Sequence, residues 1–139
     1  MLMASFVIDA SATLPWCFDD EATAYTEGLL NRCAAGEEVM VASVWPLEIA
    51  NGLLSAQRRG RVTAERVEQF LAQILRFRIH VEPCTTQQAV REVRQVAQTH
   101  QLTAYDAAYL ALALRFQLPL ATLDEALITA AHTAGIRLL

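Results

Sequence analysis

The 139-residue sequence contains no lysine, so its 11 basic side chains are all arginines. Chemistry that depends on a lysine amine is therefore excluded. Histidine and cysteine are also scarce: three of each occur, no two histidines have metal-ligand spacing, and no two cysteines form a CxxC pair. This pattern predicts reduced thiols rather than disulfides, and it excludes a zinc site built on cysteine pairs. The cysteines are Cys17, Cys33 and Cys84.

Excess positive charge and long apolar runs are absent too. The net charge is −4, which gives no electrostatic footprint for strong nonspecific binding of nucleic acid. The longest uninterrupted apolar run, residues 107–114, is too short to span a bilayer. The N-terminus has no basic region before its apolar run, unlike a signal peptide. We therefore expect a soluble, cytoplasmic protein with a single domain. The apolar share of 54% indicates that a partner covers some apolar surface.

Short apolar segments alternate with helical ones along the whole chain. Such alternation predicts an α/β sandwich in which helices cover both faces of a short parallel sheet. In such sheets, ligand sites form beyond the carboxyl ends of the strands. The predicted strands are 6–8, 39–42, 79–81, 120–123 and 136–139, and the predicted helices include 10–18, 22–35, 63–76, 85–101 and 124–134, with others beginning near Pro46 and Thr103.

The segment LTAYDAAYLALAL, residues 102–114, is apolar nearly all round and is typical of a buried helix. Asp106 in its first turn has two explanations. It could belong to a capping box with Thr103, or it could face a cation shared with other acids.

Three more acids stand where this fold would bring them to the same edge. Asp9 and Asp124 directly follow predicted strands, and Glu48 lies early in a helix, one turn before Asn51. Each alone is explained as a helix cap or by the helix dipole. Gathered together, the four carboxylates would repel one another unless a cation were present, and hard oxygen ligands suit Mg²⁺ or Mn²⁺. Such a site predicts phosphoryl chemistry by a metal-activated water.

Four segments, VIDASATLPW, PLEIANGL, LTAYDAAYLALAL and ATLDEAL, together resemble the PIN-domain ribonucleases, specifically the VapC-type toxins of bacterial toxin–antitoxin pairs. The resemblance covers the whole chain in order and spacing. It implies that Asp9, Glu48, Asp106 and Asp124 are the catalytic, metal-binding acids. It also implies supporting roles for Ser11, Asn51 and Thr122, for which a packing or capping role stays open.

The resemblance implies a single PIN domain over residues 1–139, with a parallel sheet of strand order 3-2-1-4-5. It further implies a homodimer that cleaves structured RNA (tRNA or rRNA) with Mg²⁺ or Mn²⁺, and a cognate VapB-type antitoxin seated in an apolar groove. The arginines near the end of the helix that carries Glu48 are candidates for phosphate contacts, although such a run is also typical of a solvated turn. These arginines are Arg58, Arg59 and Arg61.

Two other acid-based classes are disfavoured by single residues. Haloacid-dehalogenase phosphatases need an aspartate two residues after the first, where this chain has Ser11, and receiver domains need a lysine. Two PIN-like alternatives stay open, namely an RNA-processing nuclease without an antitoxin and a catalytically silent domain that binds RNA or protein. The presence of all four acids favours a nuclease.

Overall fold

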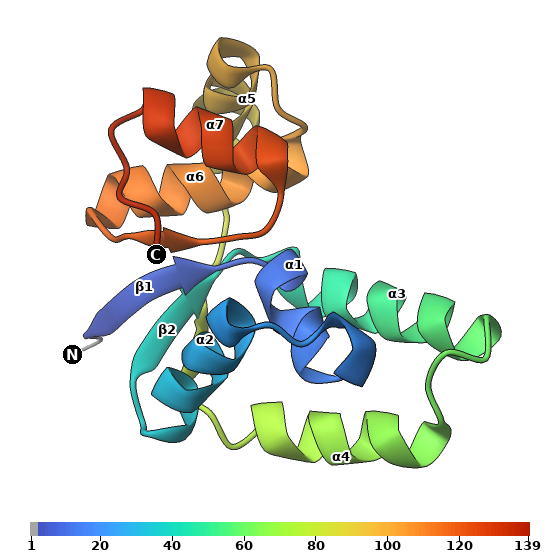
Figure 1. Ribbon diagram of the computed structural model, residues 1–139. Helices are drawn as coiled ribbons and strands as arrows, with labels where there is room; N and C mark the ends of the chain where they lie inside the picture. The colour runs from blue at the N-terminus through green and yellow to red at the C-terminus, as the bar shows by residue number, and fades with distance from the viewer. Residues whose placement is uncertain (1–2) are drawn as a thin grey trace.

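The structure is a computed structural model that describes residues 3–139, and its centre is a parallel sheet of four strands (Figure 1). The strand order is β3-β2-β1-β4, which confirms the predicted parallel α/β fold. The predicted fifth strand, 136–139, is reduced to a parallel bridge between Leu138 and Leu120. The strands are β1 (Ala4–Ile8), β2 (Glu38–Val41), β3 (Ile79–Val81) and β4 (Leu120–Ala121).

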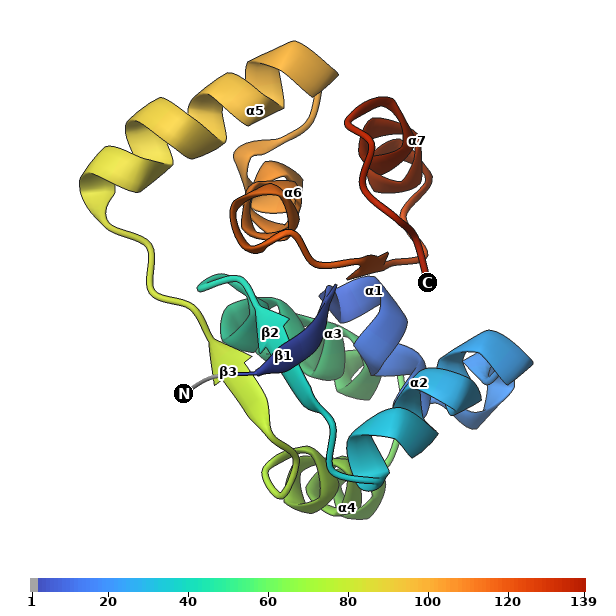
Figure 2. The ribbon, with the colours of Figure 1, turned by 90° about the vertical axis from the view of Figure 1, so that its left-hand side faces the viewer.

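Helices cover both faces of the sheet and complete three layers, as Figures 1 and 2 show from two sides. The first face carries α1 (Ala10–Thr13), α2 (Ala24–Ala34), α3 (Trp45–Arg58) and α4 (Ala64–Ile74). The second face carries α5 (Arg94–His100), α6 (Ala104–Phe116) and α7 (Glu125–Thr133). Within residues 3–139, no helix is both long and apolar enough to cross a membrane.

Three predicted elements differ in detail from the observed ones. The helix expected over 10–18 is a short α-helix followed by a 3-10 turn at Leu14–Trp16. Pro15 lies in that turn, where its missing N–H is best tolerated. The helix expected over 85–101 begins with a π-helical stretch, Gln88–Val93. The strand expected over 120–123 ends at Ala121.

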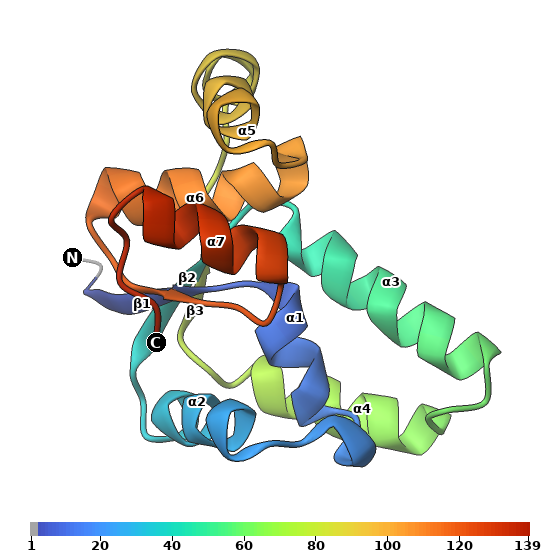
Figure 3. The same cartoon turned by 45° about the horizontal axis from the view of Figure 1, so that its top comes forward.

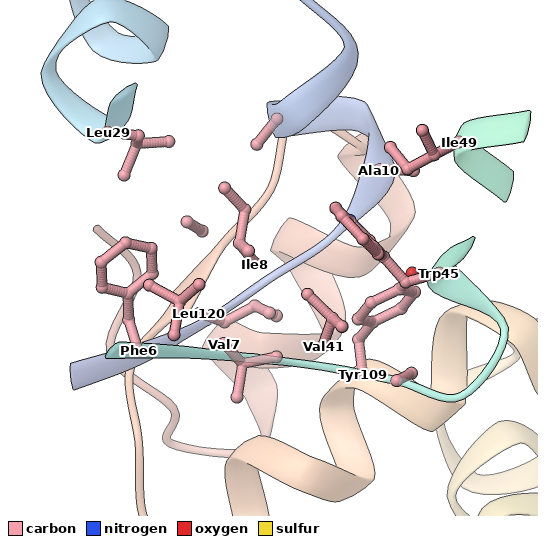
Figure 4. Packing of buried hydrophobic residues seen from close by; sticks show 14 of the residues in the cluster. Phe6, Val7, Ile8, Ala10, Leu29, Val41, Trp45, Ile49, Tyr109 and Leu120 are labelled. Carbon is pink, nitrogen blue, oxygen red and sulfur yellow. The ribbon is translucent and has the colours of Figure 1, made fainter. Parts of the chain in front are cut away.

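The core is built around β1 and α6. Residues Phe6, Val7 and Ile8 are fully buried, as expected for a parallel strand covered on both faces. Figure 4 shows these side chains packed with Leu120 and Val41 of the neighbouring strands. Helix α6 is buried on most sides, as its sequence predicted, and α7 runs beside it over the sheet (Figure 3).

One glycine determines how closely α3 approaches the chain after β1. A Cβ atom at Gly52 would lie 2.6 Å from Leu14 Cδ1, inside van der Waals contact. The absence of a side chain at position 52 therefore lets α3 pack tightly on the 3-10 turn that follows α1. This packing places the first turn of α3 near the carboxyl end of β1.

Candidate active site

Asp9 is the most deeply buried of the four predicted acids, with 4% of its surface exposed. It directly follows β1 and caps α1, because its Oδ1 accepts a hydrogen bond from the Ala12 N–H at 3.1 Å. The Ser11 hydroxyl donates to the same oxygen at 2.6 Å, and the Thr122 hydroxyl donates to Oδ2 at 2.5 Å. Both carboxylate oxygens of Asp9 are thus held in place.

The hydroxyls of Ser11 and Thr122 also join the ends of β1 and β4. Ser11 Oγ accepts from the Leu123 N–H at 2.9 Å, and Thr122 Oγ1 accepts from the Asp124 N–H at 3.0 Å. Thr122 is itself buried. These contacts explain why β4 stops at Ala121, since the backbone N–H groups that follow bond to side chains. Both hydroxyls therefore orient Asp9 directly.

Glu48 lies in the first turn of α3 and is held by Tyr109 of α6. The Tyr109 hydroxyl donates to Glu48 Oε1 at 2.5 Å, and the tyrosine is 99% buried. Figure 4 shows the ring of Tyr109 packed beside Trp45 and Val41. Tyr109 lies in the segment whose sequence predicts an apolar, buried helix, and that pattern did not predict its contact with Glu48. The one available signal was the hydroxyl itself, because a buried phenol requires a hydrogen-bond partner.

Asp106 and Asp124 stand at the first turns of α6 and α7. The Thr103 hydroxyl caps α6 by accepting from the Asp106 N–H at 3.2 Å, as the capping explanation predicted. Asp124 caps α7, and its Oδ2 accepts from the Leu127 N–H at 2.9 Å. The capping and clustering explanations are therefore compatible, because the helix starts themselves bring these acids to one edge of the sheet.

The four acids form a connected electrostatic group. Burial raises the pKa of Asp9, which hydrogen bonds from Ser11 and Thr122 lower again and the charge of Asp106 raises. Burial likewise raises the pKa of Glu48; the Tyr109 bond opposes this shift, and the charges of Asp9 and Asp106 add to it. The pKa of Asp106 is raised by burial and then by the charge of Asp124.

Within residues 3–139, no basic side chain relieves this repulsion by pairing with one of the four acids. A set of hard, mutually repelling carboxylate oxygens fits a divalent cation such as Mg²⁺. In that same range, however, no three acid, histidine or cysteine side chains already form a metal-binding group. Three of the carboxylates already accept hydrogen bonds, since Asp9 bonds to Ser11 and Thr122, Asp124 caps α7 and Glu48 bonds to Tyr109.

A cavity of about 360 Å³ opens beside two of the acids, Glu48 and Asp106. Asn51, one turn beyond Glu48 on α3, lines the same cavity, as do Leu47 and Tyr105. The structure therefore places Asn51 beside the cavity that these two acids line, and its supporting role stays a prediction.

The predicted phosphate-contacting arginines lie apart from the acids. Arg58 ends α3, about 15 Å along the helix axis from Glu48, and Arg59 follows it. Arg61 contacts Glu21 at 2.7 Å and Asp20 at 3.4 Å, so its charge is already paired. Its guanidinium also lies over the ring of Phe18.

Three matches to known proteins bear on the family and the fold of this chain. The profile of the PIN domain matches residues 6–132. Ribonuclease VapC3 of Pyrobaculum aerophilum is 27% identical over 121 residues, which cover 87% of this chain and 90% of that protein. The crystal structure of PAE2754 from Pyrobaculum aerophilum has a TM-score of 0.66 and 23% identity, covering 91% of this chain and 84% of that one. This last likeness supports the fold.

Proposed function

Because the chain belongs to the PIN-domain family, we propose that it is a VapC-type endoribonuclease whose four clustered acids hold Mg²⁺ or Mn²⁺. The observation that carries the proposal is the convergence of Asp9, Glu48, Asp106 and Asp124, of which three have raised pKa values and none has a basic partner within residues 3–139. The similarity to Ribonuclease VapC3 supports RNA as the substrate.

In this proposal each protein side chain has a distinct task. The four carboxylates would hold the cation, which supplies an activated water and offsets charge on the leaving oxygen of the phosphodiester. Ser11 and Thr122 keep both oxygens of Asp9 oriented, and Tyr109 does the same for one oxygen of Glu48. Such preorganisation by hydrogen bonds is typical of residues that support metal ligands.

The proposal includes two protein partners, a second copy of the chain and a VapB-type antitoxin. Leu54 of α3, which is 47% exposed, is consistent with an apolar contact to either. Light scattering of the purified chain tests self-association. Purification after co-expression with a short neighbouring gene product tests the antitoxin.

The primary experiment is cleavage of total tRNA and rRNA by the purified protein in Mg²⁺, in Mn²⁺ and in EDTA. We expect discrete cuts that depend on the cation and disappear in Asp9→Asn. The matched control is Asp19→Asn, which changes an acid outside the proposed site whose side chain is 95% exposed. Equal cutting by wild type and Asp9→Asn would indicate a contaminating nuclease. The absence of cutting under every condition would instead favour a silent PIN-like binding protein.

A further inference from the structure

The cavity beside the acids has an apolar rim that the fold leaves uncovered. Leu47, next to Glu48, is 72% exposed, and Tyr105, next to Asp106, is 64% exposed. Both side chains line the cavity of about 360 Å³. Among residues 3–139, Tyr105 is the most exposed large aromatic side chain. A large apolar side chain is thus presented beside each of the two acids that line the cavity.

Tyr105 lies on the same face of α6 as the buried Tyr109, but at a turn where this face is exposed. Residues four apart lie on the same face of a helix, so Tyr105 and Tyr109 share one face of α6. Tyr109 is buried against the core and bonds to Glu48, whereas Tyr105, one turn earlier, has no such cover. The same face that packs on the protein at one turn therefore offers an aromatic ring to a ligand at the next.

The charge around the rim restricts what this ligand is. The cavity lining includes Glu48 and Asp106 and no basic residue, so an anionic group would be repelled from it. A flat, uncharged group with hydrogen-bonding edges avoids that repulsion and gains by stacking on an aromatic face. Nucleobases have these properties, and every base offers a face for stacking.

We propose that Tyr105 and Leu47 form a nucleobase-binding subsite, in which the Tyr105 ring stacks on an unpaired base next to the phosphodiester bond that the proposed cation would hold. This inference rests on the proposed nuclease function. Such a subsite requires an unpaired base at the cut, in line with the single-stranded loop that the family resemblance implies, because both faces of a base in a duplex are covered by its neighbours.

Asn51 adds a means of distinguishing bases in the same subsite. It lies one turn beyond Leu47 on α3 and lines the same cavity. Its side-chain amide offers both donors and an acceptor, and paired donor–acceptor contacts of this kind discriminate between base edges. Tyr105 therefore supplies affinity that tolerates any base, and Asn51 supplies preference at one position.

The test is equilibrium binding in Ca²⁺, which carboxylate oxygens also bind, of a short single-stranded RNA that carries an abasic residue at each position in turn. Wild type, Tyr105→Phe and Tyr105→Ala are compared, with Leu75→Ala as a control at an 82% exposed leucine that directly follows α4. We expect Tyr105→Ala to weaken binding of intact RNA by about 5- to 100-fold, the range for losing one base stack. Tyr105→Phe and Leu75→Ala should bind like wild type.

The decisive result is that, at one position of the RNA, the losses of affinity caused by Tyr105→Ala and by removal of the base do not add. Removing the base that stacks on Tyr105 should abolish the effect of Tyr105→Ala, because the two changes delete the same contact. Additive losses at every position would overturn the inference. So would a Tyr105→Ala protein that binds RNA normally but loses self-association, since the rim would then be a protein interface.

The subsite and the nuclease proposal fail in different ways. RNA binding with the expected non-additivity, but no cleavage with any cation, would retain the subsite and reject the nuclease. Cation-dependent cleavage whose KM and kcat do not change in Tyr105→Ala would retain the nuclease and reject the subsite. Because the Tyr105 side chain is exposed, thermal unfolding of the variants should match that of wild type.

Discussion

The carboxyl ends of the strands and a cleft near the amino ends of β2 and β3 differ in charge. Four acids gather at the carboxyl ends, beside a cavity of about 360 Å³, and none of them forms an ion pair within residues 3–139. Next to the amino ends of β2 and β3, a cleft of about 730 Å³ is lined by arginines and by no acid. The arginines are Arg66, Arg76 and Arg78.

The larger cleft is a poorer candidate for the catalytic centre, because two of its three arginines have structural partners. Arg66 donates to the Trp16 carbonyl at 2.8 Å and lies 3.8 Å from Asp19, and Arg78 contacts Glu38 at 3.4 Å. At the acidic edge, where the four acids meet, burial and then the charges of neighbouring acids raise the pKa values of Asp9 and Asp106. The comparison teaches that uncompensated charge, rather than cavity size, marks a functional site.

The largest expected difference in cleavage rate is between a variant at the carboxyl ends of the strands and a variant beside the arginine-lined cleft. Asp106→Asn should lower the rate of RNA cleavage by about a hundredfold or more, as is typical when a group that stabilises developing charge is lost. Asp19→Asn, at the exposed acid beside Arg66, should cleave like wild type. Single-turnover rates on one RNA measure both. Comparable losses in the two variants would contradict the assignment of the acidic edge.

A smaller loss is expected when the support of Glu48 is removed. Tyr109→Phe deletes the hydroxyl that donates to Glu48, and this hydrogen bond opposes the burial that raises the pKa of Glu48. The pKa of Glu48 should rise further, cleavage at pH 7 should fall about tenfold, and the rate profile should move to higher pH. Stability should fall by about 1 kcal/mol. A rate loss with an unshifted profile would indicate a packing role alone.

The repulsion itself should be visible as a dependence of stability on pH. In EDTA, the raised pKa values mean that the folded chain binds more protons than the unfolded chain above the ordinary aspartate pKa of 3.8. The contribution of these acids to stability therefore falls as the pH rises through their folded pKa values. Urea unfolding should find Asp106→Asn equal to wild type near pH 4 and more stable at pH 7. Mg²⁺ at about ten times its Kd should stabilise wild type by about 1.4 kcal/mol and Asp106→Asn by less.

The smallest effect is expected in the arginine-lined cleft. Arg76→Ala removes a charge there without touching the acidic edge, so the cleavage rate should stay within about twofold of wild type, in line with the weak effect of exposed charges. The same single-turnover assay measures it. A large loss of cleavage would show that RNA extends across both edges of the sheet.

The parallel α/β fold and the meeting of the four acids followed from local sequence patterns. The strand order, which the family resemblance implied, is confirmed for the four observed strands. The ends of β1 and β4, together with the first turns of α3 and α6, place Asp9, Asp124, Glu48 and Asp106 at one edge. These positions are predictable because strand ends and helix starts depend on neighbouring residues. Their roles as metal ligands stay a prediction.

Contacts between distant segments were not predictable in the same way. Tyr109 and Glu48 are 61 positions apart, and nothing local in the α6 sequence specifies which side chain accepts the hydrogen bond from the tyrosine hydroxyl. The pairing of Arg61 with Glu21 likewise joins residues 40 positions apart, so a run of arginines offered no sign that one was already paired. The segment 136–139, predicted as a strand, forms only a single parallel bridge, between Leu138 and Leu120.

The hydrogen bond between Thr122 and Asp9 joins residues 113 positions apart. A ribosome adds about 5 to 20 residues per second, so Thr122 is made roughly 6 to 23 seconds after Asp9. Until then, the Asp9 carboxylate lacks one of the hydroxyls that orient it, and Asp124 has not joined it. Under the proposed nuclease function, we therefore expect a nascent chain that stops before Thr122 to be inactive.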